Sequence, residues 1–154
     1  MTDWINQRFG TNFTEEDLLN VKNFALIWNV FESTTCANNF TINRIEQRIE
    51  ERNIDIDIFA ETIAYFKDRY VTNGTFNERF AHLNFRANDR QPLVEDVLLE
   101  FNTTPNDVIL AIIIIVYRFR NNLFHGNKNI QEIDGQNENF LNANAFLSRL
   151  IDNF

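Results

Sequence analysis

Cysteine is almost absent from this chain. Its 154 residues include one cysteine, Cys36, which excludes an intramolecular disulfide framework. No histidine or second thiol accompanies Cys36 at the spacing of a metal-ligand set. We therefore expect a protein of a reducing compartment, with neither a metal centre nor another cofactor.

Long hydrophobic runs are also missing. The longest, Val108 to Tyr117, has ten residues, and a membrane-spanning helix needs about 20. The N-terminus, MTDWINQRFG, lacks the basic start and the apolar stretch of a signal peptide. These absences predict a soluble, cytoplasmic protein with no membrane partner.

Positive charge is scarce. The chain carries 22 acidic and 14 basic residues, a net charge of −8. A surface of that sign repels phosphate backbones unless the few bases are gathered in one place. Any nucleic-acid role must therefore be local.

The pattern that is present is helical periodicity. Apolar residues recur at steps of three and four, and Thr14 supplies a helix N-cap before Glu15, Glu16 and Asp17. We predict one all-α domain over residues 1–154, a helical bundle of about five to seven helices around a central apolar helix. The expected helices cover about 15–34, 42–52, 56–71 and 76–82, a short stretch after Pro92 that includes Phe101, about 106–125, and a last segment after a polar loop at about 127–136.

Two parts of this prediction stay open. Residues 75–91 show no regular pattern beyond the short helix. The run Ile112 to Val116 is also compatible with a buried strand, because β-branched residues favour strands. Helical signals on both sides, and no convincing partner strand, favour the helix.

The segment from Val108 to Gln131 contains no acid, yet it holds Arg118, Arg120, His125 and Lys128. The central helix thus leaves the core with cations at its C-terminal end. Such cations interact favourably with the helix dipole, and each interaction is worth roughly 0.3–1 kcal/mol. This interaction is the simplest structural explanation for the cluster.

Helical geometry adds a functional explanation. On an ideal helix Arg118, Asn121, Asn122 and His125 can share one exposed face. Arg120 and His125 point about 140° apart at 100° per residue. Arg120 therefore needs its long side chain, or a second subunit, to reach the histidine.

The string YRFRNNLFHGNK, Tyr117 to Lys128, resembles the signature of the HEPN superfamily: an arginine, four to six intervening residues that usually begin with a polar one, and a histidine. Arg120 and His125 fit with four intervening residues, and Arg118 and His125 with six. The segment FALIWNVFE, Phe24 to Glu32, is similar to a Trp-Asn-x-x-Glu element of the same subfamilies.

The resemblance implies a helical bundle that forms a homodimer, in which two motifs face each other as a metal-independent endoribonuclease. Many such proteins are toxins, phage-defence effectors or RNA-processing factors, and others only bind. A histidine can transfer protons to and from ribose and phosphate oxygens, and an arginine can hold the scissile phosphate.

Each motif residue then has an expected role. Arg120, Asn121 and His125 are the predicted catalytic residues, with Asn121 orienting the phosphate or the histidine. Glu32 either hydrogen-bonds the motif from the first helix or is a solvated acid at a helix end. The predicted substrate-binding residues are Arg118, Asn122, Lys128 and Glu32.

Other conspicuous residues have plainer interpretations. Trp28 and Phe124 are expected in the core, and His82 is expected to be structural. Cys36 has no base beside it in sequence that would activate it.

Three classes of function stay open: an RNA-cleaving enzyme, an inactive HEPN module that binds RNA or nucleotides and pairs with a nucleotidyltransferase or antitoxin partner, and a helical scaffold. The sequence does not distinguish among RNA substrates.

Overall fold

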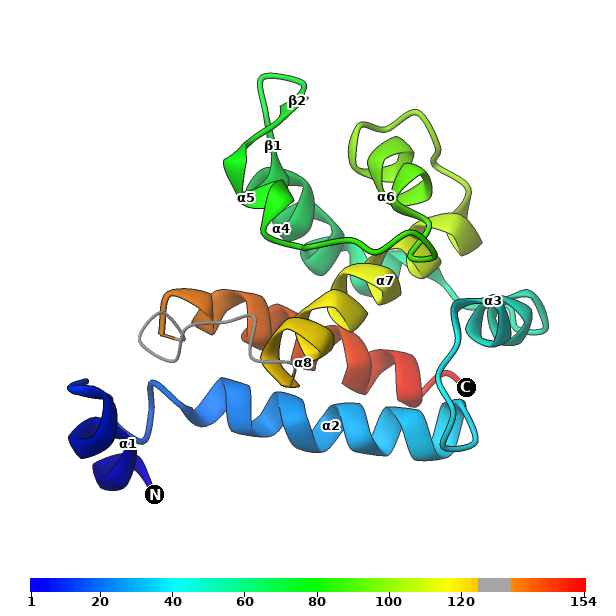
Figure 1. The fold of residues 1–154 in the computed structure, drawn as a ribbon. Helices are drawn as coiled ribbons and strands as arrows, with labels where there is room; N and C mark the ends of the chain where they lie inside the picture. The colour runs from blue at the N-terminus through cyan, green and yellow to red at the C-terminus, as the bar shows by residue number, and fades with distance from the viewer. Residues whose placement is uncertain (125–133) are drawn as a thin grey trace.

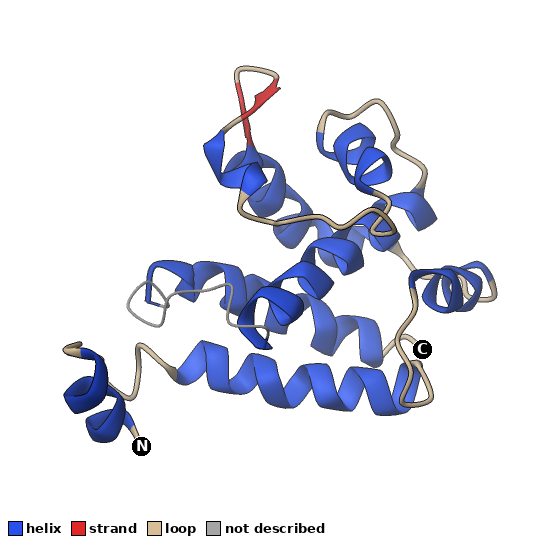
Figure 2. Ribbon diagram, viewed as in Figure 1, coloured by secondary structure: helices blue, strands red, loops and turns tan. Residues whose placement is uncertain are grey.

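The computed structural model describes residues 1–124 and 134–154 as an all-α, single-domain helical bundle (Figures 1 and 2). The described part holds eight α-helices, more than the expected five to seven, because α1 was not predicted. The elements are α1 (Thr2–Phe9), α2 (Leu19–Thr35), α3 (Ile42–Glu50), η1 (Ile56–Phe59), α4 (Ala60–Tyr70), β1 (Val71–Thr72), β2 (Thr75–Phe76), α5 (Glu78–Ala81), α6 (Gln91–Leu98), α7 (Pro105–Phe124), η3 (Asp134–Gln136) and α8 (Asn137–Ile151).

The central helix is α7, as predicted. Every side chain from Val108 to Val116 is buried, so this stretch is enclosed on all sides by other elements. In Figure 1 α7 crosses between the α2–α8 pair and the helices α4 and α6. The alternative of a strand at 112–116 is wrong, because surrounding helices bury the β-branched run without any partner strand.

Helices α2 and α8 form one layer of the bundle. Their aromatic rings meet in the core, with 5.1 Å between the centroids of Phe24 and Phe140. Asparagine side chains join the two helices at the edge of this contact. Asn20 donates to Asn137 Oδ1 at 2.8 Å, and Asn144 donates to the Asn20 carbonyl at 3.0 Å.

The first predicted helix begins later than expected. Thr14 and Asp17 bond each other reciprocally, from the Thr14 amide to Asp17 Oδ2 at 2.7 Å and from the Asp17 amide to Thr14 Oγ1 at 3.2 Å. This closes a turn before the helix, and α2 itself starts at Leu19. Helix α1 was not predicted. It ends at Phe9, and the following Gly10 has a φ of 67°, a left-handed conformation that favours glycine.

The irregular stretch after α4 contains a small antiparallel hairpin that pairs Val71 with Phe76 around a turn at Asn73 and Gly74. Asn77 then caps α5, accepting a hydrogen bond from the Arg79 amide at 3.1 Å. The short helix expected at about 76–82 is therefore present in shorter form. After α5 the chain crosses α7 (Figure 1) and reaches α6.

Two aromatic residues do not lie where the periodicity placed them. Phe101 follows the end of α6 and is 79% exposed, and Phe124 at the end of α7 is 55% exposed. Trp28, in contrast, is buried as predicted. Among the described residues, no helix is both long and apolar enough to cross a membrane.

Candidate functional site

Arg118, the first arginine of the motif, is inside the protein. Its side chain is 1% exposed, and its Nε donates to the Leu83 carbonyl at 3.0 Å. Its Nη1 lies 2.9 Å from Asp89 Oδ2. Burial lowers the pKa of Arg118, and the attraction of Asp89 opposes that shift. The guanidinium is therefore committed to an internal ion pair.

Asn122, one helical turn after Arg118, supports the same loop. It is fully buried, and its amide nitrogen lies 3.2 Å from both the His82 and the Leu83 carbonyl oxygens. Asp89 fastens the far end of the loop, because its Oδ2 also accepts a hydrogen bond from the Arg86 amide at 2.7 Å. Two motif residues thus hold the segment after α5 against α7.

Asn121 is also buried, at 2% exposure. Its Oδ1 accepts a hydrogen bond from Arg120 Nη1 at 3.1 Å, and its amide nitrogen has no partner among the described residues. The prediction that Arg118, Asn121 and Asn122 share an exposed face is wrong. The sequence pattern shows only their angular positions, and the segment from His82 to Asp89 covers Arg118 and Asn122.

Arg120 has the opposite environment. It is partly exposed, and it forms no ion pair with any acid in the described part of the chain. Its guanidinium carbon lies 5.6 Å from the centre of the exposed Phe124 ring, within the range of a cation–π contact. At 100° per residue Arg120 points about 160° away from Arg118. The motif therefore holds one internal arginine and one that solvent reaches.

The remaining motif residues, His125 and Lys128, lie outside the described residues. The distance between Arg120 and His125 therefore stays a prediction.

Glu32 is half-buried at the end of α2 and hydrogen-bonds no motif side chain among the described residues, and a bond to His125 or Lys128 stays a prediction. Its Oε2 accepts a hydrogen bond from Trp28 Nε1 at 3.2 Å, and its Oε1 accepts one from the Phe40 amide at 3.5 Å. It joins the end of α2 to the segment before α3. The Trp28 ring in turn lies 5.9 Å from the Tyr117 ring. The two sequence elements that carry the family resemblance are therefore in direct contact.

Sequence reasoning gave no function to the segment from Arg79 to Asn88, although it contains no acid. Arg79 and Arg86 form no ion pair with a described acid, and His82 is exposed. The absence of acids between Arg79 and Asn88 was the sequence feature that could have identified this basic segment. What the sequence did not show is that this segment lies directly on the motif helix.

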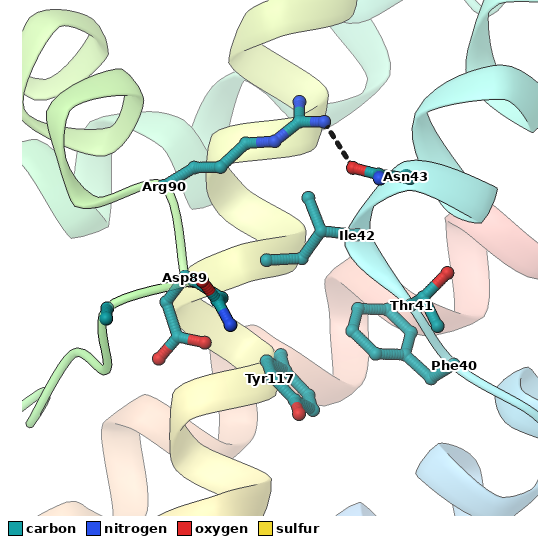
Figure 3. Close-up of a pocket in the computed structure, with 9 residues that line it drawn as sticks. Phe40, Thr41, Ile42, Asn43, Asp89, Arg90 and Tyr117 are labelled. Carbon is teal, nitrogen blue, oxygen red and sulfur yellow. Dashed lines mark hydrogen bonds between the residues drawn. The ribbon is translucent and has the colours of Figure 1, made fainter.

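A pocket of about 620 Å³ lies beside the start of the motif (Figure 3). Tyr117 and Phe40 contribute aromatic rings whose centroids are 4.5 Å apart. The sequence did not predict it, because its walls come from three separate parts of the chain. The lining residues are Phe40, Thr41, Ile42, Asn43, Ala87, Asn88, Asp89, Arg90 and Tyr117.

The described residues contain no group of three or more histidine, cysteine, aspartate or glutamate side chains placed to hold a metal ion. Cys36 is buried, and burial raises the pKa of its thiol to about 12. The chain matches no model of a known protein family, no curated protein and no solved structure.

Proposed function

We propose that this protein is a cytoplasmic, metal-independent endoribonuclease of the HEPN type. The observation that carries the proposal is the environment of Arg120. It is the motif arginine that stays partly exposed and free of any described acid, while Arg118 is neutralised by Asp89. An arginine in that state is available to a phosphate group.

The chemistry assigned to the motif is attack of the ribose 2′-oxygen on the adjacent phosphorus, with departure of the 5′-oxygen. His125 removes the proton from the 2′-hydroxyl or protonates the leaving oxygen. Arg120 holds the scissile phosphate and stabilises the added negative charge of the transition state. The products are a 2′,3′-cyclic phosphate and a 5′-hydroxyl end, and DNA is spared because it lacks the attacking group.

Local charge supports an RNA substrate despite the net charge of −8. Arg79, His82 and Arg86 follow one another on the segment that Arg118 and Asn122 hold against α7. No described acid forms an ion pair with these two further arginines. Arg79 and Arg86 therefore add unpaired positive charge beside α7, on the side of the helix that carries Arg118 and Asn122.

A homodimer is part of the proposal, because Arg120 and position 125 point about 140° apart on a helix. An arginine of one protomer then works with a histidine of the other. The outer side of α2 supplies uncharged contact surface, since Leu19, Leu26 and Val30 are all exposed there. Exposed apolar side chains at helical spacing are typical of an interface.

The decisive experiment incubates purified wild type and His125→Ala with RNA in the presence of a chelator. We expect cleavage with new 5′-hydroxyl ends by the wild type and none by the variant. Arg120→Ala should be equally inactive, and Arg52→Ala, which changes an exposed arginine outside the motif, should be fully active. A requirement for magnesium, or cleavage by His125→Ala, contradicts the proposal.

Mixing Arg120→Ala with His125→Ala tests the composite site, because a mixed dimer contains one intact pair. Restored cleavage supports the dimer, and no recovery from dimers shown to have exchanged subunits contradicts it. RNA binding without any cleavage by the wild type instead favours the inactive module that pairs with a nucleotidyltransferase or antitoxin. Expression in a bacterial host tests a toxin or phage-defence role, which predicts growth arrest with the wild type alone.

A further inference from the structure

The pocket beside Tyr117 adds a binding site to the proposed ribonuclease. We propose that it binds a nucleobase, an unpaired base of the RNA strand close to the position of cleavage. This inference rests on the proposed function for the identity of the strand, and on the pocket itself for the chemistry of the ligand.

The pocket reaches the motif helix at Tyr117. Tyr117 lines it and precedes Arg120 by three residues, a rise of about 4.5 Å along α7. Phe124 follows at a further four residues, and its exposed ring lies beside the Arg120 guanidinium. These three residues form one stripe along the helix. A strand whose phosphate contacts Arg120 therefore passes the pocket within one nucleotide.

Charge in the pocket favours a neutral ligand over a phosphate. Both Arg90 Nη1 and Arg90 Nη2 contact the carboxylate of Glu46, at 2.6 and 2.8 Å, and Nη2 also donates to Asn43 Oδ1 at 2.5 Å (Figure 3). Asp89 is paired with Arg118. Each charged group in the lining thus has an opposite charge already beside it. A phosphate would find no free cation there.

The groups left over match the edge and the faces of a base. The amide nitrogen of Asn43, the side chain of Asn88 and the hydroxyl of Tyr117 make no hydrogen bond to another described residue. Side-chain amides offer donors and an acceptor, the combination that a base edge requires. The rings of Phe40 and Tyr117 supply aromatic surface, on which bases stack without needing charge.

The size of the pocket agrees with this ligand. At about 620 Å³ it lies within the roughly 300–1,000 Å³ that small-molecule sites occupy. It has room for a base together with its ribose, and its mixed polar and aromatic lining does not suit a purely apolar ligand.

The test uses the full chain carrying His125→Ala, so that RNA stays intact. AMP, CMP, GMP and UMP are titrated separately, and then a ten-nucleotide RNA of mixed sequence, with backbone amide signals followed by nuclear magnetic resonance. We expect at least one nucleotide, and the RNA, to shift the amide signals of Asn88 and Tyr117. Asn88→Ala should weaken this binding by about tenfold, as expected for the loss of a base-edge contact of about 1–3 kcal/mol.

The matched control is Asn12→Ala, which removes another exposed asparagine, in the link between α1 and α2. It should bind as the parent protein does. Asn88 is exposed and bonds no described side chain, so its replacement leaves the fold intact. No shift at the pocket with any nucleotide or with RNA overturns the inference, and so does an unchanged affinity of Asn88→Ala. Shifts with free nucleotides but not with RNA overturn the assignment to a strand.

A second measurement separates this inference from the proposed function. In the cleaving wild type, the bases flanking each cut are read from the new 5′-hydroxyl ends, and Asn88→Ala should weaken the preference at one flanking position without abolishing cleavage. Failure to cleave at all contradicts the ribonuclease proposal and leaves the binding titration to decide the pocket. Cleavage with an unaltered base preference in Asn88→Ala contradicts the pocket alone.

Discussion

Replacing Arg118 by methionine should destabilise the fold, because it leaves Asp89 buried without its cation. Removing one partner of a buried pair typically costs about 3–5 kcal/mol. The lower end of that range applies here. Asp89 retains the hydrogen bond from the Arg86 amide, and the Leu83 carbonyl still accepts one from Asn122. We therefore expect a loss of about 3 kcal/mol, a large share of the roughly 5–15 kcal/mol that holds a typical domain together.

Urea unfolding followed by tryptophan fluorescence measures this loss, since Trp28 is buried against Tyr117. The midpoint urea concentration of unfolding should fall, while the slope of the unfolding free energy against urea concentration stays constant. The double variant Arg118→Met/Asp89→Asn should recover most of the stability, because no unpaired charge is then buried. The side-chain oxygen of the new asparagine can still accept the hydrogen bond from the Arg86 backbone amide.

Arg52→Met is the matched control, because the same substitution at an exposed arginine that forms no ion pair with a described acid should change stability by less than about 1 kcal/mol. A loss below about 1 kcal/mol in Arg118→Met would refute the reasoning. So would a double variant no more stable than the single one, since the cost would then not come from the charge left on Asp89.

Two further predictions concern buried groups near the motif. Asn122→Ala should lower the free energy of unfolding by about 1–3 kcal/mol, because the His82 carbonyl loses its hydrogen-bond donor. Amide hydrogen exchange should then rise first in the loop after α5. Unchanged exchange in that loop would contradict the claim that Asn122 holds it against α7. Cys36 should resist a thiol reagent at pH 8 in the native protein, since it is buried and burial raises its pKa to about 12, and it should react once urea unfolds the chain. Rapid labelling of the native thiol would show that α2 opens there.

The buried position of the central helix was predictable because its sequence offers no polar side that could face solvent. From Val108 to Val116 every residue is apolar, so any packing arrangement must enclose the segment, and proline at its start and a following apolar stripe both favour a helix. The start of α2 was less predictable. Thr14 and Asp17 bond each other in the same way whether the next residues form a turn or the first turn of a helix.

Phe101 shows where an apolar pattern misleads. It continues the spacing of Val97 and Leu98, yet α6 ends at Leu98 and Glu100 adopts a φ of 64°. A left-handed residue redirects the chain, so the helical stripe stops and Phe101 points away from the core. Periodicity extended past an unseen helix end assigns the wrong environment.

The environment of the motif could not be predicted from its own residues. Arg118 is buried because Asp89 and the Leu83 carbonyl meet it, and both belong to the stretch without readable periodicity. Phe80 and Leu83 of that stretch are buried, but their spacing is too short to show a helical repeat, and polar side chains of α7 hold the rest of its path. Sequence rules follow apolar repeats, and they have no means of placing a loop that is held by two polar residues from a distant helix.

The different environments of Arg118 and Arg120 follow from the position of this loop. Holding it requires Arg118 and Asn122, which share one side of α7, and on the same helix Arg120 points about 160° from Arg118. One side of the helix therefore supports the loop, and the other, with Tyr117, Arg120 and Phe124, remains at least partly exposed. Arg118 also pairs with Asp89, a loop residue that lines the pocket. The stability of the loop and the shape of the proposed base site thus depend on the same ion pair.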